Sequence, residues 1–100
     1  MRKCILSELA KNDLKRIYSY GVSKFGIHQA DIYYNELFEQ FELIARNPYL
    51  FEMVKEIRKG YHRCPFKSDT IYYQITPTEI QIITIIGAQD VIKALEKHIN

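Results

Sequence analysis

The stretch NPYLFEMVKEIRKGYHRCPFKSDTIYY, residues 47–73, decides the fold, because within it the apolar pattern changes from helical to strand periodicity. It also holds a concentration of positive charge. Between residues 46 and 67 there are six basic side chains and two acidic ones, a local charge of +4 in a chain whose total is +2. Such a concentration predicts a polyanion or an acidic protein as partner, the simpler alternative being a solvated strand face. We call the following residues the basic cluster: Arg46, Lys55, Arg58, Lys59, Arg63 and Lys67.

Upstream of this stretch, apolar residues recur three or four positions apart in two runs, which is typical of amphipathic helices. Ser7 is a good N-cap for the first helix, Gly26 allows it to stop, and Asn47-Pro48 ends the second. The outer face of the first helix is basic, whereas the second has four acidic residues and no lysine or arginine between positions 27 and 45. We therefore expect an antiparallel two-helix hairpin, preceded by a short strand over residues 3–6.

Downstream, β-branched and aromatic residues alternate with other residues over 70–75 and 80–86, which predicts two strands joined by a turn. Residues 55–59 and 61–66, divided by Gly60, add one or two more. The last strand is apolar on both faces, so we expect it to be central or covered on both sides. After Gly87 the pattern predicts a short C-terminal helix. The predicted class is α+β, with an N-terminal strand and the helical hairpin packed on a three- to four-stranded antiparallel sheet.

Composition sets the remaining expectations. A chain of 100 residues that is 47% hydrophobic predicts one domain over residues 1–100. No apolar run approaches the length of a membrane span, and the start lacks the features of a signal peptide, so we expect a cytoplasmic protein. Cys4 and Cys64 belong to no CxxC motif, and no histidine lies at metal-ligand spacing. The two isolated cysteines predict two reduced thiols, and we expect no metal or cofactor.

Several motifs are distributed along the chain: Ala10-x-x-Asp13-Leu14-x-x-Ile17, Phe25-Gly26, Ala45-x-Asn47-Pro48, Glu56-Ile57-Arg58-x-Gly60-Tyr61 and Ile71-x-Tyr73. In their order and spacing these motifs resemble the RelE/ParE toxin family, and its ParE branch in particular. The resemblance covers nearly the whole chain and implies a bacterial type II toxin, encoded beside an antitoxin whose C-terminal segment wraps it. In the ParE branch it implies DNA gyrase as the target.

The resemblance implies a binding protein that is not an enzyme and has no catalytic residues of its own. We expect the antitoxin to place an amphipathic helix, and an added strand, on the hairpin and the sheet edge, and to cover the basic cluster with acidic side chains. Neither a membrane nor sequence-specific nucleic acid is expected as a partner. The residues predicted to bind antitoxin or target are Lys55, Arg58, Lys59, Tyr61, Arg63, Lys67, Tyr72, Gln89 and Lys93.

One alternative is a ribosome-dependent mRNA-cleaving enzyme, since the family also contains such ribonucleases. Where those nucleases resemble this chain, they carry two arginines and a tyrosine at the positions held here by Thr70, Gln89 and Leu95. Neutral side chains cannot supply the charge that a phosphoryl-transfer transition state demands. His62 is the one group suited to act as a base near neutral pH, and a strand histidine between a tyrosine and an arginine is more often a half-exposed polar residue.

The chain also departs from the ParE pattern at Phe51, Asp69 and Gly87, where the family usually has glycine, histidine and histidine. The segment after the last strand is implicated in gyrase poisoning across the branch, and its start at residues 87–90 is atypical. A second alternative is therefore a toxin-like domain that has lost activity and acts only as a regulatory partner.

Overall fold

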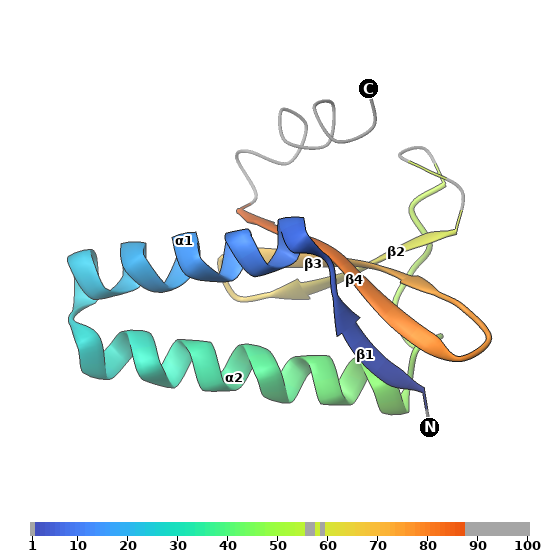
Figure 1. The fold of residues 1–100 in the computed structure, drawn as a ribbon, viewed down its shortest axis with the longest axis horizontal. Coiled ribbons are helices and arrows are strands. Elements are labelled where there is room, and N and C mark those ends of the chain that lie inside the picture. Colours follow the sequence, from blue (N-terminus) through green and yellow to red (C-terminus); the bar gives the residue numbers. More distant parts are fainter. Residues whose placement is uncertain (1, 56–57, 59, 88–100) are drawn as a thin grey trace.

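The computed structural model describes residues 2–55, 58 and 60–87, and its elements follow the expected order (Figure 1). The two helices form an antiparallel hairpin on one face of a four-stranded sheet with the strand order β1-β4-β3-β2. This arrangement confirms the α+β class and the packing of the hairpin on the sheet. The elements are β1 (Lys3–Leu6), α1 (Glu8–Phe25), α2 (Ile27–Arg46), β2 (Tyr61–Phe66), β3 (Asp69–Ile75) and β4 (Glu79–Gly87).

One detail of the sheet differs from the expectation. β1 pairs in parallel with β4, Lys3 lying opposite Glu79, so the sheet is mixed and not wholly antiparallel. The helical hairpin, and not a tight turn, follows β1, and this longer connection permits the parallel direction. Residues 55–59 and 61–66 were expected to supply one or two strands, and the second range forms β2. Of the first range, Lys55 lies in a turn and Arg58 in no strand, and an isolated bridge joins Met53 to His62 at the outer edge of β2. The predicted C-terminal helix lies outside the described residues.

Local sequence accounts for the helix ends. The Ser7 hydroxyl accepts a hydrogen bond from the Ala10 N–H at 3.0 Å and caps α1. Gly26 separates the helices with a φ of 93°, a conformation that favours glycine, while its N–H donates to the Val22 carbonyl. Near this end the helices approach closely, because a Cβ on Gly21 would meet the Cβ of Ala30 at 3.3 Å.

The core lies between the hairpin and the helix-facing side of the sheet. Leu14, Leu37, Phe41 and other helix residues pack against strand residues that are almost fully buried. In β4 the pairing with β3 shifts between Tyr72 and Tyr73, whose partners are Thr84 and Ile82, so the intervening residue of β4 forms a β-bulge. Because of this extra residue, the strand members of the core cluster are Ile80, Ile82 and Ile85 in β4, Ile71 and Tyr73 in β3, and Cys64 in β2. The prediction that the last strand is central is confirmed.

Helix α1 and its N-cap residue also supply hydrogen-bond partners for backbone groups at the edge of β4, beyond the point where β1 ends. The Ser7 N–H and hydroxyl donate to the carbonyls of Ile82 and Ile83 at 3.0 and 2.6 Å. Further along, the Ile85 N–H donates to the Asp13 carboxylate at 2.9 Å, and Arg16 donates to the Ile85 carbonyl at 3.0 Å. These side chains replace the hydrogen bonds that a longer β1 would have made.

Candidate protein-interaction site

The loop between α2 and β2, residues 47–60, is fixed to the sheet. The buried Tyr73 hydroxyl donates to the Pro48 carbonyl at 2.7 Å, which holds the start of the loop over the core. The Val54 N–H donates to the Tyr61 carbonyl at 2.8 Å, and the Arg63 N–H donates to the Glu52 carbonyl at 3.1 Å. The described part of the loop is therefore held along the outer edge of β2.

This loop exposes large apolar side chains beside cations. Tyr49, Leu50 and Met53 are 70%, 66% and 46% exposed. Lys55 and Arg58 are exposed as well, and no ion pair joins either of them to another residue that the structure describes. Apolar groups next to unpaired cations suit a partner segment that is apolar on one side and acidic on the other. We call Tyr49, Leu50, Met53, Lys55 and Arg58 the loop surface.

The apolar members of the loop surface were missed by sequence reasoning. Tyr49, Leu50 and Met53 belong to neither periodic run, and an apolar residue is assigned to the core by default. The one available signal was the Asn47-Pro48 break, because residues that follow a helix end and precede a strand lie in a connection at the surface.

Arg63 and Tyr72, both predicted site residues, are opposite one another in the pairing of β2 with β3. They lie on the face of the sheet turned away from the helices, since the alternating neighbours Ile71 and Tyr73 belong to the core. The Arg63 guanidinium donates to Glu52 at 2.7 Å and lies within 2.6 Å of it through a second nitrogen, and this contact raises the pKa of Arg63. Tyr72, although predicted to bind a partner, is buried and only 1% exposed. Burial raises the pKa of the Tyr72 hydroxyl, and the neighbouring guanidinium partly offsets the shift.

Lys67 lies on the other side of the sheet. It has a φ of 51°, which breaks the strand alternation at the turn. Its ammonium group donates to Glu36 of α2 at 2.7 Å and lies 5.7 Å from the centre of the Tyr33 ring. Lys67 therefore lies on the helix side of the sheet, whereas Arg63 lies on the opposite face. Tyr61 is buried at the start of β2, and Lys59, Gln89 and Lys93 lie outside the described residues.

His62 is buried and not half-exposed as expected. Its Nδ1 lies 3.0 Å from the Phe51 carbonyl, and its ring is stacked on that of Tyr73 with the ring centres 5.2 Å apart. The side chain points to the helix side, away from Arg63, because successive strand residues face opposite ways. Its contacts hold the loop on the sheet.

The two thiols are engaged in the core. Burial raises the pKa of Cys4 and of Cys64, which disfavours the reactive thiolate. Among residues 2–55, 58 and 60–87, no group of three histidine, cysteine, aspartate or glutamate side chains is arranged to hold a metal ion. Neither helix of the described structure is long and apolar enough to cross a membrane.

The hairpin-on-sheet architecture is shared with solved structures. A chain described as the chromosomal ParDE TA system from P. aeruginosa superposes with a TM-score of 0.77 at 19% identity, covering 87% of this chain and 96% of that one. A conserved hypothetical protein from Helicobacter pylori has a TM-score of 0.56 at 13% identity, covering 91% and 99% of the two chains. The fold thus defines the class as α+β proteins in which a helical hairpin covers one sheet face.

Sequence comparison gives the family. Residues 4–98 match the family described as the ParE toxin of type II toxin-antitoxin system, parDE. The chain is 33% identical to Toxin ParE1 of Caulobacter vibrioides over 86 residues, which are 86% of this chain and 88% of the relative. It is 28% identical to Toxin ParE1 of Mycobacterium tuberculosis over 96 residues, 96% of this chain and 90% of the relative. The chain belongs to the ParE toxin family and is the toxin component of a type II toxin-antitoxin system.

Proposed function

We propose that this toxin acts in the cytoplasm by binding and inhibiting DNA gyrase, without catalysis of its own, and that a cognate antitoxin silences it. One observation carries the proposal for binding over catalysis. Arg63, Lys67 and His62, three side chains suited to nuclease chemistry, are already engaged in contacts that hold the fold together.

The contacts can be followed group by group. A ribonuclease of this fold needs cations free to meet a phosphate and a group able to exchange a proton. Arg63 is bonded to Glu52 and Lys67 to Glu36. The His62 ring is buried against Tyr73, with Nδ1 directed at a backbone carbonyl. These contacts favour a protein that works by occupying a surface of its target.

For the antitoxin we propose the loop surface together with Arg63. The loop surface supplies apolar area and two cations without described acidic partners, which an amphipathic acidic segment would complement. A partner carboxylate at Arg63 has to replace or share Glu52, since that carboxylate already holds the guanidinium. Lys67 stays outside this surface because it faces α2. Gln89 and Lys93 remain proposed contacts to the target.

The test is expression of the toxin in bacteria, with and without its antitoxin. Gyrase inhibition predicts a DNA-damage response and filamentation, both suppressed when the antitoxin is co-expressed. In parallel, purified toxin is incubated with ribosomes programmed with mRNA. Site-specific cuts in that mRNA, with arrest of translation in cells, would replace the proposal by the mRNA-cleaving alternative. No toxicity in either assay would support an inactive regulatory partner.

A further inference from the structure

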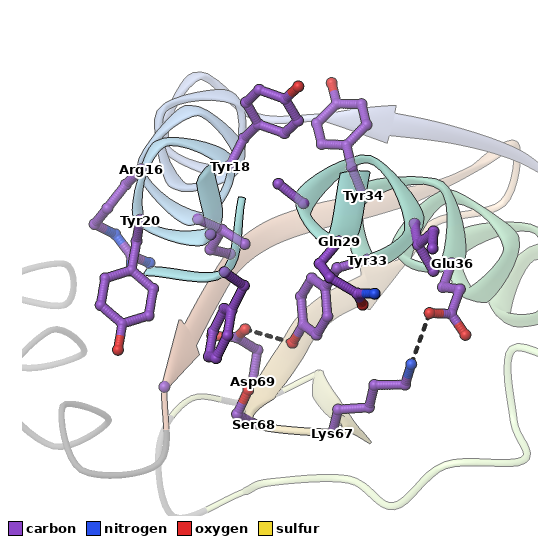
Figure 2. Close-up of a pocket in the computed structure, with 16 residues that line it drawn as sticks. Arg16, Tyr18, Tyr20, Gln29, Tyr33, Tyr34, Glu36, Lys67, Ser68 and Asp69 are labelled. Atoms are coloured by element: carbon purple, nitrogen blue, oxygen red, sulfur yellow. Dashed lines mark hydrogen bonds and ion pairs between the residues drawn. The ribbon is translucent and has the colours of Figure 1, made fainter. Parts of the chain in front are cut away.

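A cleft of about 860 Å³ lies between the connected ends of the two helices, the turn that joins β2 to β3, and the end of β4 (Figure 2). It is separate from the loop surface, which lies at the other end of α2 (Figure 1). Aromatic side chains dominate its walls, and charged groups lie along its rim. The lining residues that matter here are Arg16, Tyr20, Phe25, Ile32, Tyr33 and Gly87.

Several polar groups that line the cleft are already hydrogen-bonded to other residues of the protein. The Tyr33 hydroxyl donates to the Asp69 carboxylate at 2.6 Å, and Lys67 donates to Glu36 at 2.7 Å, as the dashed lines in Figure 2 show. Arg16 is bonded to the Ile85 carbonyl. Because these polar groups are already bonded, they gain little from a polar ligand. The surface that remains available to a ligand is therefore mainly apolar.

The apolar surface is large and lies open. Tyr20, Phe25 and Ile32 are 57%, 62% and 42% exposed. A concave site with this much exposed aromatic surface favours an occupant that supplies aliphatic side chains.

Such an occupant lies directly downstream in the same chain. Gly87 is both the end of β4 and part of the cleft wall, where a Cβ on it would lie 3.8 Å from the Ser68 carbonyl oxygen and 3.9 Å from the Asp69 carboxylate. The sequence continues from there with AQDVIKALEKHIN, residues 88–100, in which Val91, Ile92, Leu95 and Ile99 recur at helical spacing. We call residues 88–100 the tail.

Chain geometry keeps the start of the tail near the cleft. Four residues span at most about 14 Å when fully extended, so Val91 cannot lie farther than that from Gly87. Asp90, three residues after Gly87, is confined to within about 11 Å of it. The exposed Arg16 guanidinium, on the same wall, offers this carboxylate a cation of opposite charge.

We propose that the tail docks in this cleft, with Val91, Ile92 and Leu95 against Tyr20, Phe25 and Ile32. Lys93 and Lys97 then point outward, because they lie between the apolar positions of the tail. The inference goes beyond the proposed function and does not depend on the identity of the target. It assigns the hairpin end a partner within the same chain.

Disulfide trapping in the full chain tests the docking directly. In a Cys4→Ser background, which removes the half-buried thiol, one variant carries Phe25→Cys with Leu95→Cys. The control carries Leu50→Cys with Leu95→Cys, since Leu50 is as exposed as Phe25 but lies on the loop surface. We expect the cleft pair to form the intramolecular disulfide at least about tenfold faster than the control pair, as expected when one arrangement is populated over others.

Hydrogen–deuterium exchange of the tail amides gives a second readout without added cysteines. We expect Tyr20→Ala with Phe25→Ala to speed exchange in the tail by about tenfold or more, and Tyr49→Ala with Leu50→Ala to leave it unchanged. Unchanged exchange of the β3 and β4 amides verifies that each variant is folded. Equal trapping rates for the two cysteine pairs, or tail exchange indifferent to the cleft variants, would overturn the proposal. A disulfide between two molecules would also overturn it and assign the cleft to a second copy.

Discussion

Replacing Asp13 by alanine should destabilise the protein through β4, although Asp13 lies on α1. Asp13 is 9% exposed, and its carboxylate accepts hydrogen bonds from the Thr84 hydroxyl and the Ile85 N–H. Arg16 lies 3.6 Å from its other oxygen. In the Asp13→Ala protein the buried Ile85 N–H loses its acceptor, and α1 keeps only the bonds of Ser7 and Arg16 to the edge of the sheet.

The magnitude follows from these contacts. A hydrogen bond to a charged group contributes about 1.5 to 3 kcal/mol, and a buried donor left without a partner costs about 1 to 3 kcal/mol. The Thr84 hydroxyl can rotate toward another acceptor, so we count chiefly the backbone donor and the loss of charge. We expect the free energy of unfolding to fall by about 2 to 4 kcal/mol, a large share of the roughly 5 to 15 kcal/mol typical of a small domain.

Urea unfolding followed by circular dichroism measures this loss. With a slope of about 1 to 2 kcal/mol per molar urea, the midpoint should fall by about 1 M or more. Asp31→Ala is the matched control, because Asp31 is an exposed helix carboxylate that accepts a hydrogen bond from the Tyr18 hydroxyl, and its loss should cost less than about 1 kcal/mol.

A double-mutant cycle sharpens the interpretation. Thr84→Val removes the second partner, so Asp13→Ala and Thr84→Val together should cost less than the sum of the two single changes, with a coupling of about 0.5 kcal/mol or more. A loss below about 1 kcal/mol for Asp13→Ala, or strictly additive effects, would refute the reasoning that α1 completes the edge of β4.

Three further outcomes are expected. Gly26→Ala should lower the free energy of unfolding by about 1 to 3 kcal/mol in urea melts, because Gly26 has φ 93° and ψ 161°, a conformation that costs alanine backbone strain. A Cβ at this position meets no atom within 4 Å, so the cost lies in the backbone alone. A loss near zero would contradict this, and Gly21→Ala is the comparison within a helix. Burial and the bond to Asp69 raise the pKa of Tyr33 from 10.0 to about 12, so the Tyr33 contribution to stability is complete below pH 10 and is lost as the pH rises to 12. Tyr33→Phe should make the decline of stability over that range less steep, and an unchanged slope would count against the assignment. Arg58→Ala should weaken antitoxin binding and reduce its salt dependence more than Lys67→Ala, since Lys67 is bonded to Glu36 on the helix side of the sheet. Equal effects of the two variants in titrations at low and high salt would show that the antitoxin binds outside the loop surface.

The spacing of apolar residues and the residues that start or end helices were sufficient to predict the two helices. The three- to four-residue spacing of apolar residues, Ser7, Gly26 and Asn47-Pro48 are local features, and the structure has the helix ends where they indicate. The parallel pairing of β1 depends instead on a partner some 76 positions away, Lys3 opposite Glu79, and four residues hold no local record of their direction. The bulge in β4 could not be predicted either. Both faces of this strand carry apolar residues, so the sequence pattern does not show where the alternation of side chains between the faces shifts by one residue.

The site was harder to predict for a similar reason. Charge density in the sequence grouped Arg63 and Lys67, yet the positive φ of Lys67 turns its side chain toward α2. Linear charge counts also cannot foresee that Glu52 and Glu36 neutralise these two cations from different elements. Lys55 and Arg58 are exposed, and their role in binding stays a prediction, whereas their exposed apolar neighbours were not predicted.

The central claim is that this toxin inhibits gyrase by binding and is silenced by its antitoxin. A supercoiling assay with purified gyrase, relaxed plasmid and increasing toxin tests it most directly, with antitoxin added back in a parallel series. The account predicts loss of supercoiling activity as toxin increases, full recovery with stoichiometric antitoxin, and no cleavage of mRNA on ribosomes by the same preparation. Undiminished supercoiling at saturating toxin, from a preparation that is folded and binds its antitoxin, would contradict it.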